Sequence, residues 1–213
     1  MSSSPRIAAV LLVATGLGCA LRAYAPVPRP TTGEWAEAWG KETRAAHLYD
    51  GFSHRANATV THLTLAVREA RARRLAEWLG WTPQELEQRL AQERAEAAAG
   101  EDFVVSFYTA DPRANDLDAR QSIWRIAVQL DHEDLLASRV TALEPDATLR
   151  QLFPYVGPFE VVYRVTFPRR PDGELAGRPF VLLLASALGQ LPIDFSAPAV
   201  PVRVVEPAPP SAY

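Results

Sequence analysis

Large apolar side chains recur at every second position in three stretches of the chain, and this period constrains the fold more than any other feature. The stretches are residues 103–108, 124–130 and 159–167. Successive side chains of a β-strand point to opposite faces of a sheet, so each stretch predicts a strand with one buried face. Residues 180–184 are continuously apolar, which indicates a central strand, and residues 138–143 indicate a weaker strand.

Helical signals come before these strands. Trp35 and Trp39 are four residues apart and share a helix face that Ala46 continues, so we expect a helix from about residue 32 to the turn Asp50-Gly51. Residues 54–65 are rich in β-formers and predict a strand that runs into a second helix.

Two helices are expected before the strand at residues 103–108. Residues 68–79 carry Leu75 and Leu79 on one face, and an arginine cluster that we interpret as a solvated face paired with acidic neighbours. The cluster consists of Arg68, Arg71, Arg73 and Arg74. The stretch Thr82-Pro83-Gln84-Glu85 predicts the start of the next helix, because it combines a threonine N-cap, a proline at the first position and a capping-box glutamate.

Together these elements predict an α+β fold with a mostly antiparallel sheet and with helices on one face, inserted between the first and second strands. Outside that insertion, the connections between strands are too short for helical crossovers, which excludes a parallel sheet. A two-sheet sandwich is the alternative arrangement.

Composition narrows the class of protein. The chain has 213 residues, 48% hydrophobic and 22% charged, as is typical of a globular protein with a sizeable core. A net charge of −3 argues against a nucleic-acid partner, since nucleic-acid-binding proteins carry a basic patch. Cys19 is the only cysteine, so neither an intramolecular disulfide nor a cysteine-based metal site can form.

The beginning of the chain is typical of a secretory signal peptide. Arg6 supplies a positive charge, residues 7–17 are almost entirely apolar, and small residues surround Cys19. The apolar run is shorter than the roughly 20 residues of a membrane-spanning helix, which favours a cleaved signal.

The stretch Gly16-Leu17-Gly18-Cys19 resembles the lipobox of bacterial lipoproteins. The resemblance implies that the chain is cut before Cys19, that acyl groups on Cys19 anchor the protein, and that it resides at the outer membrane because Ala20 follows and not aspartate. Ordinary cleavage near Ala20, which releases a soluble periplasmic or secreted protein, is the alternative.

The predicted organisation has four parts. Residues 1–18 are the signal peptide, residues 19–31 the lipidated cysteine and a proline-rich tether, residues 32–197 the α+β envelope domain, and residues 198–213 a proline-rich disordered tail.

The sequence contains no catalytic motif that we recognise. It has no HExxH pair, no Gly-x-Ser-x-Gly elbow, no P-loop and no Rossmann glycine pattern, so we expect neither enzymatic activity nor a cofactor. Glu101 and Asp102 are adjacent on a predicted strand and should point to opposite faces, which argues against a carboxylate pair. The histidines form no close ligand pair, which favours structural roles: His47, His54, His62 and His132.

Two other stretches are candidate sites. Four oxygen-bearing side chains between two strands could bind Ca²⁺, although their spacing lacks the EF-hand glycine and glutamate and favours a plain turn: Asp111, Asn115, Asp116 and Asp118. The aromatic stretch at residues 153–159 predicts either a docking surface made of Phe153, Tyr155 and Phe159 or a turn packed under the sheet.

These observations favour a non-enzymatic lipoprotein that binds or braces another component of the cell envelope. Its expected partners are the membrane, through the acyl groups on Cys19, and an envelope protein. The order of elements resembles that of small uncharacterised envelope lipoproteins of GC-rich bacteria. The alternatives are an envelope hydrolase with a scattered polar site and a carrier of a hydrophobic ligand, which would need an open apolar cavity between sheet and helices.

Overall fold

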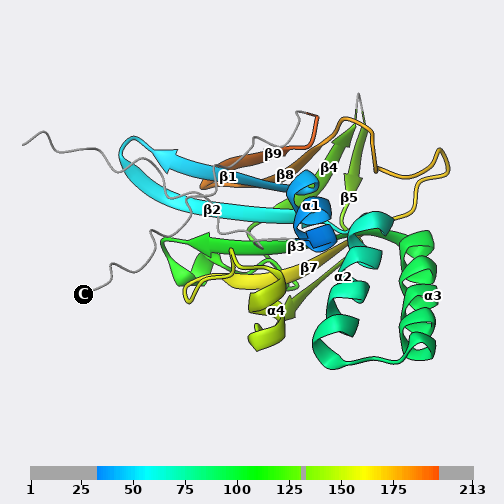
Figure 1. Ribbon diagram of the computed structural model, residues 1–213. Helices are drawn as coiled ribbons and strands as arrows, with labels where there is room; N and C mark the ends of the chain where they lie inside the picture. The colour runs from blue at the N-terminus through cyan, green and yellow to red at the C-terminus, as the bar shows by residue number, and fades with distance from the viewer. Residues whose placement is uncertain (1–32, 131–132, 197–213) are drawn as a thin grey trace, which may run out of the picture.

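The computed structural model describes residues 33–130 and 133–196 (Figure 1). Its helices are α1 (Gly33–Lys41), α2 (Leu65–Leu79), α3 (Pro83–Ala99) and α4 (Ala147–Leu152), with a 3-10 turn at Pro112–Ala114. Its strands are β1 (Thr43–Asp50), β2 (Ser53–His62), β3 (Gly100–Thr109), β4 (Arg125–Leu130), β5 (Glu133–Leu136), β6 (Arg139–Leu143), β7 (Val161–Pro168), β8 (Val181–Ser186) and β9 (Gly189–Asp194). The expected signal peptide, tether and tail, Cys19 and His132 lie outside the described residues.

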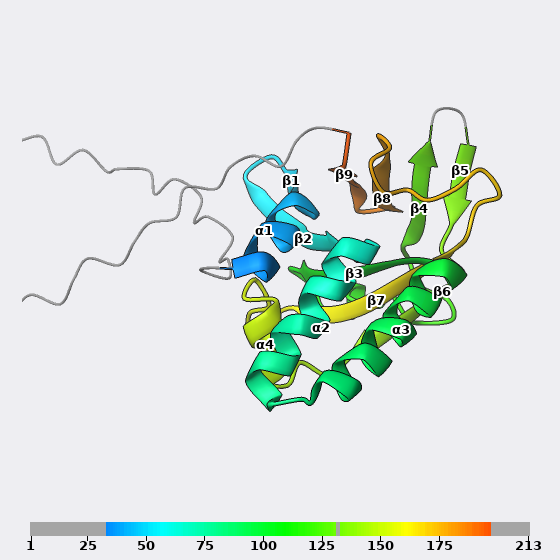
Figure 2. The ribbon, with the colours of Figure 1, turned by 45° about the vertical axis from the view of Figure 1, so that its right-hand side comes forward.

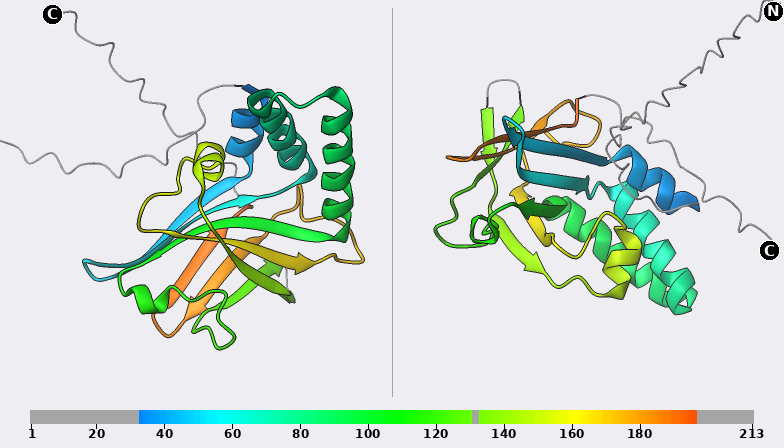
Figure 3. Two further views of the ribbon diagram at one scale, coloured as in Figure 1. Left: turned by 90° about the horizontal axis from the view of Figure 1, so that it is seen from below. Right: turned by 90° about the vertical axis from the view of Figure 1, so that its left-hand side faces the viewer.

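Two antiparallel sheets form a sandwich, and the helices form a third layer. The larger sheet has the order β1-β2-β3-β7-β6 and the smaller sheet the order β5-β4-β8-β9. The helices lie on the side of the larger sheet that faces away from the smaller one (Figures 2 and 3). The predicted α+β class with a mostly antiparallel sheet is confirmed, in its sandwich form.

The apolar side chains that recur at every second position fill the space between the sheets. In β3, Phe103, Val105 and Phe107 are fully buried and face the smaller sheet. Every second residue of β4 and β7 joins them, so one continuous apolar core lies between the two sheets. Burial of this core is the main favourable term in folding.

A second apolar cluster joins the helices to the outer face of the larger sheet. Trp35 and Trp39 on α1 are both buried there, as the prediction of a shared face requires. Trp35 packs edge-on against Phe153 with ring centroids 5.6 Å apart, and its indole N–H donates to the carbonyl of Leu152 at 3.2 Å. Trp39 stacks on Tyr155 at 5.9 Å.

The first helix is shorter than expected, and the prediction that it reaches Asp50 is wrong. It ends at Lys41, and Thr43–Asp50 forms β1, which pairs along its length with β2. Ala46 and Leu48 pack against the core between the sheets, so their spacing reflects a strand. Pairing with β2 outweighs the local helical pattern.

Two further differences between the expected and the observed fold concern the place of the helices in the strand order and the strands at the sheet edges. The helices α2 and α3 lie between the second and third strands, and not between the first and second as expected. The strands β5 and β9 were not expected; both are short edge strands. Pro192 interrupts the pattern of β9, which an edge position tolerates because one side of the strand makes no ladder hydrogen bonds.

The predicted start of α3 is confirmed in detail. The side chain of Thr82 accepts from the backbone N–H of Glu85, and the Glu85 carboxylate accepts from the backbone N–H of Thr82. Gly100 then ends the helix and begins β3, beside β7.

We predict that Gly100→Ala destabilises the protein by about 1–3 kcal/mol, because a Cβ atom there would lie 2.7 Å from the carbonyl oxygen of Phe167 and would push strand backbones apart. Gly40→Ala in α1 is the matched control, because its Cβ atom would meet no atom within 4 Å and a helix favours alanine. Urea unfolding of both variants measures the effect. Equal stabilities would contradict this account.

Candidate functional site

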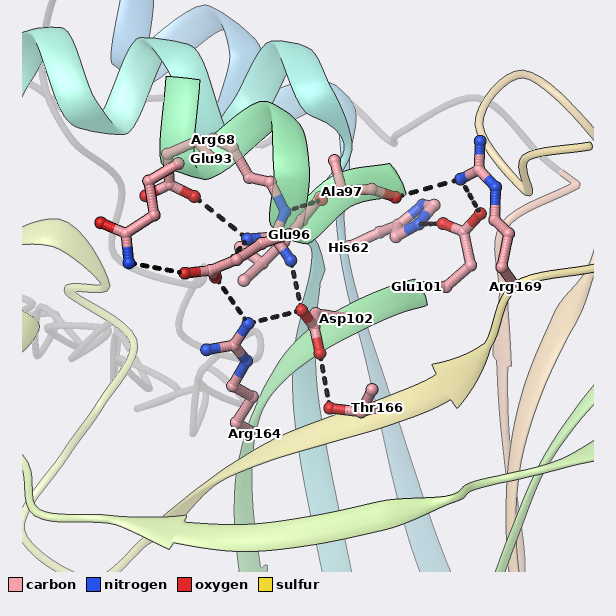
Figure 4. A network of polar contacts seen from close by, with 12 residues as sticks. His62, Arg68, Glu93, Glu96, Ala97, Glu101, Asp102, Arg164, Thr166 and Arg169 are labelled. Atoms are coloured by element: carbon pink, nitrogen blue, oxygen red, sulfur yellow. Dashed lines mark hydrogen bonds and ion pairs between the residues drawn. The ribbon is translucent and has the colours of Figure 1, made fainter. Parts of the chain in front are cut away.

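A buried charge network joins the helices to the larger sheet (Figure 4). Its centre is the guanidinium group of Arg68, which is fully buried. Arg68 Nη1 donates to Glu93 Oε2 at 3.0 Å, and Arg68 Nη2 donates to the carboxylate of Asp102. Arg68 Nε donates to the carbonyl of Leu63 at 3.0 Å. One side chain of α2 therefore holds α3 and β3 together.

The network continues onto β7. Arg164 Nη2 donates to Asp102 Oδ2 at 2.6 Å and to Glu96 Oε2 at 2.9 Å. Thr166 Oγ1 donates to the second oxygen of Asp102 at 2.5 Å. In the register of β3 and β7, Asp102 is paired with Thr166. Arg164 lies two residues before Thr166 on the same face of β7, so the sheet itself brings these side chains together.

Arginines also surround Glu93. Arg71 Nη2 and Arg89 Nη2 both donate to Glu93 Oε1, at 2.8 Å and 2.6 Å. Burial acts to raise the pKa of Glu93, but the charges and hydrogen bonds of the arginines outweigh burial and leave this pKa below its usual value. Burial also acts to raise the pKa of Asp102, but its contacts with Arg164, Thr166 and Arg68 outweigh burial and lower this pKa. Both carboxylates are ionised at neutral pH.

Positive charge is in excess within this network. Its guanidinium groups belong to Arg68, Arg71, Arg89 and Arg164, and its carboxylates to Glu93, Glu96 and Asp102. Burial lowers the pKa of Arg71, and the attraction of Glu93 offsets that effect only in part. A further negative charge near Arg71 would therefore be stabilised.

A cleft of about 310 Å³ opens beside these arginines, between the helices and the outer face of the larger sheet. We call it the arginine cleft. Its polar lining is Arg71, Arg89, Arg164, Asp146 and Thr148. Its apolar lining is Leu63, Leu75, Val104, Leu143, Leu149, Leu152 and Phe153.

Three arginines line the arginine cleft, and each has one buried nitrogen without a hydrogen-bond partner in the described part of the chain. The Nε atoms of Arg71, Arg89 and Arg164 are buried, and none of them donates to a described residue. The guanidinium groups of the lining are charged and present several donors, so they favour a ligand with oxygen acceptors. Asp146 is exposed at the rim, where it accepts from the backbone N–H of Leu149 and caps α4.

The prediction of a wholly solvated arginine face on α2 is wrong for Arg68 and Arg71, which contact buried Glu93, and is confirmed for Arg73 and Arg74. Arg73 pairs with Glu69, and Arg74 pairs with Glu77. Arg68 points inward because it lies one turn after Thr64, the N-cap of α2, at the point where α2 leaves the sheet. The position directly after the buried strand was the sequence signal that could have identified it.

Three of the four Ca²⁺ candidates make hydrogen bonds within the turn that follows β3 or to its neighbours. Asp111 accepts from Arg113, Asn115 Nδ2 donates to the carbonyl of Phe107 at 2.8 Å, and Asp116 accepts from Ser122. These contacts fit the turn interpretation. Burial and the nearby Asp118 carboxylate raise the pKa of Tyr163 to about 12. Across residues 33–130 and 133–196, no group of three histidine, cysteine or acidic side chains could hold a metal ion.

The three aromatic residues that were candidates for a docking surface differ in burial. Phe153 and Tyr155 are buried in the helix layer, which fits a packed turn and removes them from any docking surface. Phe159 is 78% exposed and stays available to a partner.

Glu101 and Asp102 point to opposite faces of β3, as expected. The Glu101 carboxylate meets His62 at 3.0 Å, whereas Asp102 meets the arginines. His47 and His54 lie near Tyr49 and Tyr108 at the other end of the larger sheet, with ring centroids between 5.1 and 6.3 Å apart.

Comparison with protein-family models, curated proteins and solved structures finds no match to this chain. Among the described residues, no helix has the length and apolar character needed to cross a bilayer.

We predict that Arg68→Met lowers the free energy of unfolding by about 3–5 kcal/mol, because it leaves the buried carboxylates without their central cation. Arg73→Met, which removes an exposed arginine of the same helix, should cost at most about 1 kcal/mol. Urea titrations followed by tryptophan fluorescence compare the two variants. If Arg68→Met lowered the free energy of unfolding as little as Arg73→Met does, that result would rule out a structural role for the network.

Proposed function

We propose that this protein is a non-enzymatic bacterial lipoprotein, held at the outer membrane by acyl groups on Cys19, whose domain binds a small acidic amphiphile in the arginine cleft. The anchor rests on the lipobox-like sequence and on the placement of the only cysteine. At least two acyl chains give stable attachment to a bilayer. Residues 19–31 then serve as a spacer between bilayer and domain.

The observation that carries the binding function is the division of the arginine cleft into an apolar and a cationic side. An alkyl chain would be removed from water by the leucines and Phe153. An acid group would accept from the guanidinium groups of Arg71, Arg89 and Arg164, which line the cleft, and would balance the excess positive charge.

The size of the cleft limits the ligand. A volume of about 310 Å³ lies at the lower end of the range for small-molecule sites. A cleft of this size fits an acid with an alkyl chain of medium length better than a whole phospholipid, so octanoate is a suitable probe. This proposal joins the binding role expected from the sequence with the carrier alternative, which required a cavity between sheet and helices.

We predict that the full chain in mild detergent binds octanoate at least about tenfold more tightly than 1-octanol, which has the same alkyl chain without the charge. Arg89→Gln should reduce this preference, because it removes one donor at the rim of the cleft. Leu75→Gln should weaken the binding of both compounds. Isothermal titration calorimetry measures all three effects.

Arg94→Gln is the matched control for this experiment. Arg94 lies on the same helix as Arg89, pairs with Glu69 and Glu87, and does not line the cleft. Equal affinity for octanoate and 1-octanol would show that the arginines do not recognise an acid, and absence of binding by either compound would refute the proposed ligand.

Docking to an envelope protein is the second candidate function. Phe52 and Phe159 are both highly exposed. Phe52 precedes β2 and Phe159 precedes β7, and both strands begin beside the end of β3. Failure of the octanoate experiment would favour this candidate, since exposed aromatic side chains are enriched at protein interfaces.

The anchor is tested separately. We predict that Cys19→Ser abolishes incorporation of a labelled fatty acid and moves the protein from the membrane fraction to the soluble fraction, because acyl transfer needs the thiol. Ala20→Ser, which keeps the cysteine, should behave like the unaltered protein. Full membrane association of the Cys19→Ser protein would refute the lipoprotein proposal.

A further inference from the structure

A second cavity, of about 400 Å³, lies where α1 meets β1. The last residue of β2, His62, forms part of its wall, together with the chain at 175–180 and residues 195–196 after β9. None of its lining residues lines the arginine cleft. It is therefore a separate site.

The polar group at its base is the fully buried imidazole of His62. His62 Nε2 lies 3.0 Å from Glu101 Oε2, and Glu101 also accepts from Arg169 Nη1 and from the backbone N–H of Leu175. Burial acts to raise the pKa of Glu101, but these hydrogen bonds and the charges of His62 and Arg169 lower it below its usual value. An ionised carboxylate only accepts, so His62 Nε2 carries a proton and donates to Glu101.

The other ring nitrogen of His62 lies toward Glu42. His62 Nδ1 is buried and has no hydrogen-bond partner among the described residues. Its neighbour is Glu42 Oε2, at 3.8 Å, which is too long for a hydrogen bond. The Glu42 carboxylate lines the cavity and favours an ammonium group on a ligand.

The rest of the rim has the opposite charge. Lys41, Arg44 and Arg178 all line the cavity and come from three different segments. Asp172 holds Arg178 at 2.9 Å, and the guanidinium group of Arg44 lies 5.3 Å from the ring centre of Phe195. These cations favour a carboxylate on the ligand.

An aromatic pair forms the apolar wall. Phe180 and Phe195 stack with ring centroids 4.7 Å apart, and the edge of His62 packs against both. Leu175 completes this wall. An apolar side chain of a ligand would be removed from water here.

We propose that this second cavity binds a zwitterionic amino acid with an apolar side chain. Its ammonium group donates to Glu42, its carboxylate pairs with the cations of the rim, and its side chain packs on Phe180 and Phe195. No bond is made or broken in this binding.

The test compares three related compounds on the full chain in mild detergent by isothermal titration calorimetry. L-leucine carries both charges, N-acetyl-L-leucine lacks the ammonium group, and L-leucinamide lacks the carboxylate. We expect L-leucine to bind at least about tenfold more tightly than either derivative, since each derivative forfeits one set of charged hydrogen bonds. Equal binding of N-acetyl-L-leucine, or no binding of L-leucine, would overturn the proposal.

Variants at the rim locate the site. Glu42→Gln should weaken L-leucine binding about tenfold, because it removes the charge that faces the ammonium group. Glu37→Gln on α1 is the matched control, since Glu37 does not line this cavity. Octanoate binding should be the same in both variants, so failure here leaves the proposed function of the arginine cleft unaffected. An unchanged L-leucine affinity in Glu42→Gln would place the ligand elsewhere.

Discussion

Burial of the Arg68 guanidinium group fixes how the helices sit on the larger sheet. A buried cation is tolerated only with anionic and hydrogen-bonding partners, and Arg68 finds them on α3, on β3 and in the carbonyl of Leu63. Asp102 then engages Arg164 on β7. Polar contacts of this kind are directional, so they set the position of the helices more narrowly than the apolar cluster beside them.

The arginine cleft follows from this arrangement, whereas the second cavity is formed by other parts of the chain. The arginine cleft lies where α2, α3 and α4 leave part of the outer face of the larger sheet uncovered, next to the arginines that the network places there. The second cavity lies where α1, the end of β2 and the chain after β9 meet. The adjacent residues Glu101 and Asp102 serve the two regions separately, since a strand points them to opposite faces.

Sequence reasoning was most successful where a local signal agrees with the tertiary environment. The alternation at 103–108 and 159–167 predicted strands because one face of each packs on a core, and the Thr82–Glu85 capping box is a purely local interaction. It failed for Thr43–Asp50, where pairing with β2 decides the conformation. It also missed the candidate site, because a partner such as Glu93 is 25 residues from Arg68 in the chain.

The sequence by itself determined the class of fold, the place of the helical insertion after the strand that ends at His62, and the expectation of an anchor at Cys19. Only the tertiary structure decided which charged side chains are buried. Periodicity reports how a residue is oriented on its own element, whereas burial depends on which other elements pack over that residue. Arg68 and Arg73 look alike in the sequence, yet packing against α3 and β3 buries the first and leaves the second at the surface.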